Sequence, residues 1–241
     1  MSQQPQSRRR LPSAAAVIVL VLAGLGLWSF AARGNLAPKN YGVVDEGRVY
    51  RAGQMTPAAM HRVIEKNHIK TIIDLGSYYG GDANQPEAGP RIKDAEGERR
   101  NQRVADALRV ERYVMPLFGD GTGNANWYIH ALRIMNDPAK QPVLVHCGAG
   151  SERTSVACAL YEHMRQGTSF DNGVKEARAF RHDPKRNPHV SEMLNSWGEK
   201  IIECVRGGGQ LSDPRFPPIP EPRPQPPTPA DPGPATAAVD R

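Results

Sequence analysis

Short runs of β-branched and other apolar residues alternate with longer segments whose apolar positions recur at helical spacing. The runs that predict buried strands are residues 69–75, 110–115 and 143–145. The segments that predict amphipathic helices are residues 56–67, 99–108, 125–136 and 155–164. The first helix has a clear start, because Thr56 is a good N-cap and Pro57 suits the first helical position. Strands that alternate with helices predict an α/β domain, in which helices cover a central sheet.

An uncharged, mostly apolar run occupies residues 14–32. Its length is about what a helix needs to cross the hydrocarbon core of a bilayer. Three arginines at residues 8–10 precede it, and this charge bias places residues 1–13 in the cytoplasm and the rest of the chain outside. We therefore expect a single-pass signal anchor and a membrane location. A cleaved signal peptide, with secretion of the domain, is the alternative.

The alternating pattern ends near residue 206. Three glycines follow, and then many prolines with few apolar residues to bury. This composition predicts a disordered tail over residues 207–241. With residues 33–40 as a linker, one folded domain is expected at residues 41–206.

Composition and charge exclude several classes of protein. The net charge is +6 and the pI about 9.4, but the basic residues are spread along the 241-residue chain, so nucleic acid is not an expected partner. Cys147, Cys158 and Cys204 are too few and too widely spaced for a disulfide scaffold or a paired-cysteine zinc site. No metal and no cofactor are expected.

The most informative segment is residues 146–154, His-Cys-Gly-Ala-Gly-Ser-Glu-Arg-Thr, between a predicted strand and a predicted helix. A tight turn that leads into a helix offers backbone N–H groups and the positive end of the helix dipole to an anion. Cys147 would lie at the mouth of this cradle, where a thiol loses its proton readily, so we expect it to be a thiolate nucleophile. The residues expected to bind phosphate are Gly148, Ala149, Gly150, Ser151, Glu152 and Arg153.

Two side chains after the cysteine suit phosphoryl transfer. Arg153 would lie across the loop, where its planar fork can hold two phosphoryl oxygens. Thr154 would place a hydroxyl near the sulfur and help it leave when a phosphocysteine is hydrolysed. Cys158 is expected to be a small buried hydrophobic residue, and a disulfide between it and Cys147 is the alternative.

His146-Cys147, five residues and then Arg153-Thr154 resemble the signature loop of protein tyrosine phosphatases, nearer the dual-specificity branch. Val-Tyr-Arg-Ala-Gly-Gln at residues 49–54 and residues 69–75 also resemble the N-terminal part of bacterial and fungal dual-specificity-like phosphatases, and the resemblance covers about residues 41–204. It implies a mostly parallel sheet and hydrolysis of phosphate monoesters through a cysteinyl-phosphate. It also implies that His146 hydrogen-bonds locally and favours the ionised cysteine.

The resemblance further implies an upstream aspartate that protonates the leaving oxygen and then activates water. Asp120, in the glycine-rich loop at residues 116–124, is the expected acid. Asp82 and Asp94 are weaker alternatives, and Asp120 could instead cap its own turn.

The expected substrate is a phosphorylated protein, with phosphotyrosine favoured and phosphoserine or phosphothreonine allowed, or a small phosphate ester. Glu152 stands where members that act on inositol polyphosphates carry a basic residue, which disfavours a highly anionic substrate. A rhodanese-like sulfurtransferase is disfavoured by Arg153-Thr154, and a pseudophosphatase that only binds phosphate is disfavoured by the intact Cys147 and Arg153. The oligomeric state is not predicted.

Overall fold

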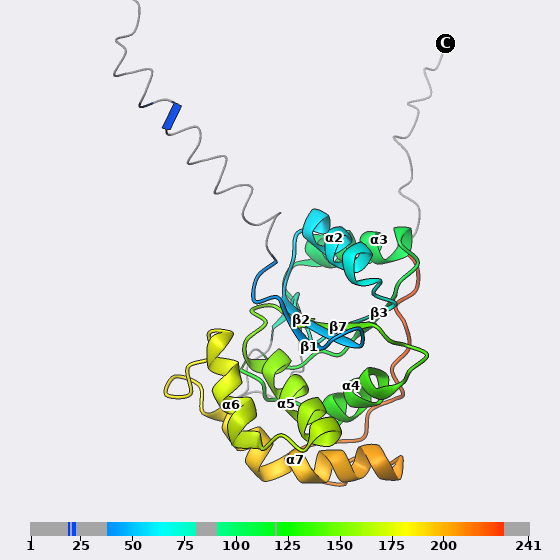
Figure 1. Ribbon diagram of the computed structural model, residues 1–241. Helices are drawn as coiled ribbons and strands as arrows, with labels where there is room; N and C mark the ends of the chain where they lie inside the picture. The colour runs from blue at the N-terminus through cyan, green and yellow to red at the C-terminus, as the bar shows by residue number, and fades with distance from the viewer. Residues whose placement is uncertain (1–18, 20, 23–37, 81–90, 119, 229–241) are drawn as a thin grey trace, which may run out of the picture.

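The computed structural model describes residues 19, 21–22, 38–80, 91–118 and 120–228. A five-stranded sheet lies at its centre, between two layers of helices (Figure 1). In spatial order its strands are β1 (Gly42–Asp45), β2 (Val49–Gly53), β7 (Val143–Cys147), β3 (Thr71–Asp74) and β6 (Glu111–Val114). β1 runs antiparallel to β2, and the other neighbouring pairs are parallel. The α/β class is confirmed, and the sheet is mixed.

Two helical layers cover the sheet (Figure 1). One face carries α2 (Pro57–Asn67) and α3 (Ala95–Ala107). The other face carries α4 (Asn126–Asn136) and α5 (Glu152–Gln166), with α6 (Phe170–Ala179) and α7 (His189–Gly207) packed outside them. A small hairpin of β4 (Tyr79–Gly80) and β5 (Arg91–Ile92) lies apart from the main sheet.

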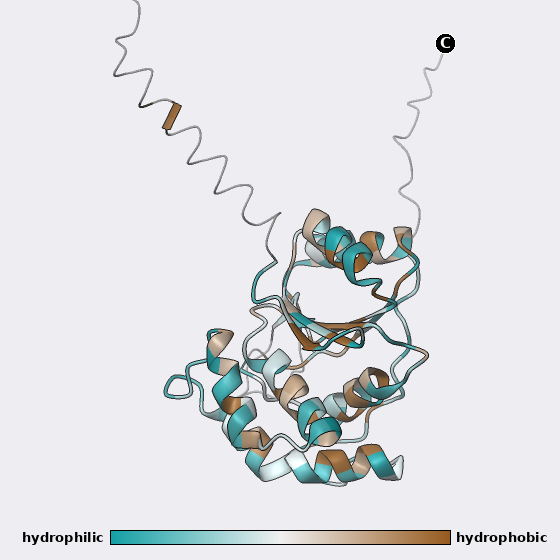
Figure 2. Cartoon of the chain, in the orientation of Figure 1, coloured by the Kyte–Doolittle hydropathy of each residue, from teal (hydrophilic) through white to brown (hydrophobic). Residues whose placement is uncertain are grey.

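Alternation along the strands separates two apolar cores, because successive side chains of a strand point to opposite faces. Ile72 and Leu144 join the core under α2 and α3, whereas Ile73 and Val145 join the larger core under α4, α5 and α7. The central strands are accordingly hydrophobic along most of their length (Figure 2). Burial on both faces explains why these strands appear in the sequence as continuous apolar runs.

The predicted helix start at Thr56 is confirmed. Its side chain accepts a hydrogen bond from the backbone N–H of Ala59 at 3.2 Å, and Pro57 is the first helical residue. α3 begins earlier than predicted, at Ala95, because the carboxylate of Asp94 accepts the N–H of Gly97 at 2.8 Å and caps the helix.

The C-terminal segment differs from the predicted disordered tail as far as residue 228. It runs from the end of α7 past α4 to the edge of the sheet (Figure 1). The side-chain amide of Asn126 bonds the N–H of Leu211 at 2.7 Å and the carbonyl of Phe216 at 3.0 Å, and both apolar side chains are buried. Further along, the N–H of Gln225 bonds the carbonyl of Arg112 on β6 at 2.7 Å. The composition of the segment does not reveal these hydrogen-bond partners. Residues 229–241 lie outside the described residues.

The predicted single-pass membrane location is overturned. In the described part of the chain, no helix is both long and apolar enough to cross a bilayer. Even α7, with 19 residues, is interrupted by charged residues such as Glu199 and Lys200. The predicted anchor at residues 14–32 lies outside the described residues, apart from Val19, Val21 and Leu22.

Candidate active site

The candidate site forms where three parallel strands end at the same edge of the sheet. The register places Gly53 of β2 opposite Cys147 of β7, and Asp74 of β3 opposite His146. β7 ends at Cys147 and α5 begins at Glu152, so the loop between them lies at the N-terminus of a 15-residue helix. The Cys147 side chain is only 1% exposed, and its Sγ accepts the N–H of Gly150 at 3.2 Å. The backbone N–H of Gly150 thus points at the sulfur, at the N-terminus of α5.

Close backbone contact with β2 fixes the shape of this loop. Gly150 has a φ of +73°, and a methyl group on it would lie 2.5 Å from the backbone nitrogen of Gly53. The N–H of Gln54 also bonds the carbonyl of Gly148 at 3.1 Å. Glycine is therefore required at residue 150 both by its backbone conformation and by its neighbour.

Arg51 of β2 supports the loop between β7 and α5 by hydrogen bonds. Its Nη2 donates to the carbonyl of Gly150 at 2.8 Å and to the hydroxyl of Ser155 at 2.9 Å, while its guanidinium stacks 3.6 Å from the ring centre of Phe180. Asn40 adds a bond from its Nδ2 to the carbonyl of Ala149 at 2.9 Å. Neither residue was predicted as part of the site, although Arg51 lies in the segment that resembles known phosphatases.

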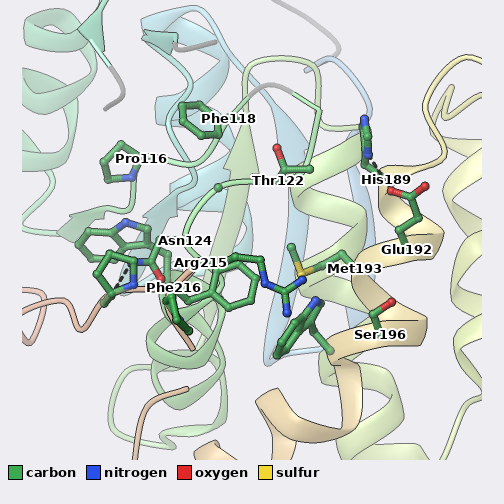
Figure 3. Close-up of a pocket in the computed structure, with 15 residues that line it drawn as sticks. Pro116, Phe118, Thr122, Asn124, His189, Glu192, Met193, Ser196, Arg215 and Phe216 are labelled. Atoms are coloured by element: carbon green, nitrogen blue, oxygen red, sulfur yellow. Dashed lines mark hydrogen bonds and ion pairs between the residues drawn. The ribbon is translucent and has the colours of Figure 1, made fainter. Parts of the chain in front are cut away.

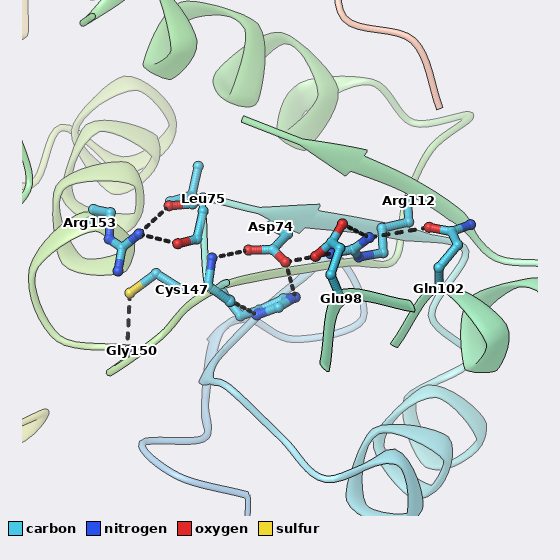
Figure 4. Close-up of polar contacts among 11 residues, drawn as sticks. Asp74, Leu75, Glu98, Gln102, Arg112, Cys147, Gly150 and Arg153 are labelled. Carbon is cyan, nitrogen blue, oxygen red and sulfur yellow. Dashed lines mark hydrogen bonds and ion pairs between the residues drawn. The ribbon is translucent and has the colours of Figure 1, made fainter. Parts of the chain in front are cut away.

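Arg153 is buried and held by the turn that follows β3 (Figure 4). Its Nη1 donates to the carbonyls of Leu75 at 2.8 Å and Gly76 at 2.6 Å. Its Nη2 lies on the side of the loop, since a methyl group on Gly148 would be 3.4 Å from it. One end of the guanidinium is thus fixed, and the other lies near Gly148 of the loop.

His146 and Thr154 are both fully buried. His146 Nδ1 pairs with the hydroxyl of Ser77 at 2.9 Å, the kind of local hydrogen bond that the resemblance implies. Burial lowers the pKa of His146, although the carboxylate of Asp74, 3.9 Å from its Nε2, opposes this effect, so the ring is neutral near pH 7. Among the described residues, the Thr154 hydroxyl has no hydrogen-bond partner.

The loop that carries Asp120 packs against the start of α5, but its carboxylate is turned toward its own loop. A methyl group on Gly121 would lie 3.6 Å from Cβ of Glu152. The carboxylate of Asp120 accepts the N–H of Thr122 at 2.9 Å and its hydroxyl at 2.6 Å. This is the turn-capping arrangement that the sequence left as an alternative. Asp94 caps α3 instead, and Asp82 lies outside the described residues.

Cys158 lies nearly two turns into α5 and is 2% exposed. Burial raises the pKa of its thiol to about 12, so it stays protonated. Cys147, Cys158 and Cys204 are all free thiols. Among the described residues, no group of three or more His, Cys, Asp or Glu side chains is placed to hold a metal ion.

A separate cavity of about 860 Å³ lies behind the Asp120 loop, between that loop, α7 and residues 214–217 (Figure 3). Its walls include Phe118, Trp127, Met193, Trp197 and Phe216. Cys147 does not line it, so the cavity is a neighbour of the candidate site and not part of it.

A central sheet, a Cys-x5-Arg loop between strand and helix, and an arginine fixed across that loop define a cysteine-dependent phosphatase of the protein tyrosine phosphatase superfamily, dual-specificity-like. The family described as a dual-specificity-type phosphatase fused to NAD⁺ kinase matches residues 37–194, more than half of the chain. The chain belongs to this family.

Two solved structures with TM-scores above 0.5 support the same fold. The Siw14 catalytic core is 19% identical, with a TM-score of 0.53, and the match covers 71% of this chain and 92% of that one. A second structure, the core catalytic domain of the PP-IP phosphatase SIW14 from S. cerevisiae with citrate, is 20% identical, with a TM-score of 0.53 and coverage of 71% and 93%. TpbA of P. aeruginosa is 17% identical, with a TM-score of 0.49 and coverage of 70% and 91%. No curated protein matches the chain.

Proposed function

We propose that the protein hydrolyses phosphate monoesters at Cys147 through a cysteinyl-phosphate intermediate, without a metal ion. The observation that carries the proposal is the geometry around the sulfur. Sγ accepts the N–H of Gly150 at 3.2 Å, at the N-terminus of α5, and Arg153 is fixed across the same loop by two carbonyls. This arrangement stabilises both a thiolate and a phosphoryl group.

In the first step, the thiolate attacks phosphorus, the S–P bond forms and the P–O bond to the leaving group breaks. The backbone N–H groups of residues 148–153 and Nη2 of Arg153 hold the other phosphoryl oxygens. Asp120 donates a proton to the leaving oxygen, for which its carboxylate must turn away from Thr122. The loop offers the needed freedom, because Gly121 and Gly123 both have positive φ.

In the second step, water attacks phosphorus and Asp120 takes a proton from it. The S–P bond breaks, the thiolate is restored and inorganic phosphate leaves. The Thr154 hydroxyl, unpaired among the described residues, donates to the sulfur as its negative charge returns. This assignment gives each candidate residue a distinct part in the cycle.

For the substrate, we propose phosphotyrosine in proteins, with phosphoserine and phosphothreonine as poorer substrates. A sulfur that is only 1% exposed is reached more easily by a long aryl phosphate than by a short alkyl phosphate. Glu152, at the first turn of α5, adds a carboxylate beside the loop and disfavours a substrate with many phosphates.

The test is hydrolysis of an aryl phosphate by the full chain, compared with Cys147→Ser and the matched control Cys204→Ser. We expect no turnover for the first variant and ordinary turnover for the second. An inactive wild-type chain that still binds phosphate would favour the pseudophosphatase, and sulfur transfer from thiosulfate to cyanide would favour the rhodanese alternative. A panel of phosphotyrosine peptide, phosphoserine peptide and inositol pyrophosphate then tests the substrate class, and the proposal fails if the last is preferred.

A further inference from the structure

We propose that the buried Asp74–Arg112 pair is the positioning element of the active-site loop: by fixing the turn after β3, it places both Arg153 and His146. This inference rests on the proposed function, since it concerns how the same site is held ready. Neither Asp74 nor Arg112 lies in the signature loop, and they come from two other strands.

Asp74 holds the turn after β3 through its carboxylate. Both carboxylate oxygens of Asp74 are used: Oδ1 accepts the N–H of Ser77 at 2.6 Å, and Oδ2 accepts Nη2 of Arg112 at 2.6 Å. Asp74 and Arg112 are buried. The carboxylate thus closes the turn Asp74–Ser77 on one side and is clamped from β6 on the other.

The turn after β3 holds the side chains of Arg153 and His146. Nη1 of Arg153 donates to the carbonyl of Leu75 (Figure 4) and to the carbonyl of Gly76. The hydroxyl of Ser77 pairs with Nδ1 of His146. Gly76 has a φ of +83°, and a methyl group on it would lie 3.1 Å from Nη1 of Arg153. Three consecutive residues of one turn therefore bond the two side chains that flank the nucleophile.

Arg112 is held in place by two side chains of α3. Glu98 of α3 accepts two hydrogen bonds from it, at 2.8 Å to Nη1 and 2.7 Å to Nη2, and Gln102 accepts a third at 3.2 Å. Register explains why Arg112 reaches Asp74: it lies opposite Ile72, two residues before Asp74, so the two charged side chains share one face of the sheet. A chain of contacts thus runs from α3 through β6 and β3 to the loop.

Stability alone does not account for this pair. A buried ion pair pays a large desolvation cost, and replacing it with packed apolar residues is often neutral or stabilising. Burial opposes the charge of Asp74, yet His146, Arg112 and the hydrogen bonds from Ser77 outweigh burial and lower the pKa of Asp74 to about 2. The pair is therefore ionised throughout the physiological range, and its directional bonds fix the turn in a way that apolar contacts do not.

The experiment separates positioning from stability. Arg112→Met should lower kcat for an aryl phosphate roughly 10–100-fold, because a small displacement of Arg153 has effects of this size. The double variant Asp74→Leu with Arg112→Met removes both charges of the pair, leaves the Glu98 carboxylate as the remaining charge, and should regain part of the melting temperature that the single variant loses. Its kcat should stay at least 10-fold below wild type. Recovery of kcat together with stability would overturn the inference.

Two further variants make the result independent of how the double variant folds. Asp74→Asn keeps an acceptor for Ser77 but weakens the clamp, and vanadate binding to this variant should weaken at least 10-fold, which reports the placement of Arg153 without turnover. The control is Glu111→Gln, on the same strand as Arg112. It removes the ion pair of Glu111 with Lys140, whose atoms are 2.6 Å apart, and does not alter the turn. It should leave both kcat and vanadate affinity unchanged. Wild-type vanadate affinity in Asp74→Asn would contradict the inference. An inactive wild-type enzyme would instead contradict the proposed function.

Discussion

Gly53 and Gly150 lie against each other through their backbones, so that β2 forms the floor of the loop that carries Cys147. A methyl group on Gly53 would lie 2.6 Å from the carbonyl oxygen of Ala149, a backbone atom that cannot swing aside. The two glycines let the loop that follows Cys147 rest directly on the sheet.

Gly53→Ala should therefore displace the loop and lower kcat/KM at least 10-fold, with a loss of about 1–3 kcal/mol in the free energy of unfolding. Enzyme kinetics and chemical denaturation measure the two effects. Gly207→Ala is the matched control, since no atom lies within 4 Å of the added methyl group there, and it should cost neither activity nor stability. Full activity in Gly53→Ala would mean that the loop tolerates displacement from β2.

Thr154→Val should slow the second chemical step more than the first. The valine keeps the shape of the threonine, but it cannot donate a hydrogen bond to the sulfur as the phosphocysteine is hydrolysed. We expect a burst of released alcohol equal to the enzyme concentration, followed by slow turnover, in rapid-mixing kinetics. Because the buried hydroxyl has no partner among the described residues, the variant should also be more stable by about 1 kcal/mol. Equal slowing of both steps would argue against this role.

Asp120→Asn should impair substrates in proportion to the basicity of their leaving group. An amide cannot protonate the leaving oxygen, so an alkyl phosphate should lose roughly 10²–10⁴-fold in kcat, whereas an aryl phosphate with an acidic leaving group should lose far less. Thr122→Val is the control: it removes one of the two hydrogen bonds that turn the carboxylate inward but keeps the acid. An equal loss for both leaving groups would show that Asp120 caps its loop and does no acid catalysis.

The sequence places the proposed nucleophile and its proposed partners in one loop because they are contiguous there. Cys147, Arg153 and Thr154 take their places from a single strand–turn–helix unit, and local sequence defines such a unit well. The α/β class follows similarly from apolar runs that alternate with amphipathic segments.

The sequence does not predict that Asp74 and Arg112 support the site, because they are distant in the sequence and only the register of the sheet brings them together. Asp74 and Arg112 are 38 residues apart and meet only because β3 and β6 are parallel neighbours. Each does leave a signal: a charged side chain stands at an inward position of an apolar strand, which is costly unless the charge is paired. The order of the C-terminal segment is not predicted for another reason. Composition alone does not reveal that the side-chain amide of Asn126 bonds the backbone of this segment.

Removal of the C-terminal segment tests how far it belongs to the domain. A chain that ends at Gly209 loses the buried side chains of Leu211 and Phe216 and uncovers the edge of β6 at Arg112. Loss of the two side chains should lower the free energy of unfolding by about 3–6 kcal/mol in total, and an uncovered edge strand should promote aggregation. A chain that ends at Thr228 is the control and should melt as the full chain does. Identical melting of both truncated chains would show that the segment adds no stability.

Glu162 gives the stability a dependence on pH that a single substitution can test. Burial and, next, the like charge of Glu176 together raise the pKa of Glu162 to about 7, although Arg51 opposes both. A carboxyl whose pKa is higher in the folded state favours folding while it is protonated, and this contribution is lost as the pH rises from the unfolded pKa, near 4.3, through about 7. Glu162→Gln stays neutral at every pH. It should therefore melt higher than wild type at pH 8 and close to wild type at pH 4.5, as scanning calorimetry at the two pH values would measure. Lys175→Gln is the control, because it changes the charge of an exposed residue on α6, and its effect on the melting temperature should be the same at both pH values. A difference between Glu162→Gln and wild type that is the same at both pH values would rule out a titrating Glu162.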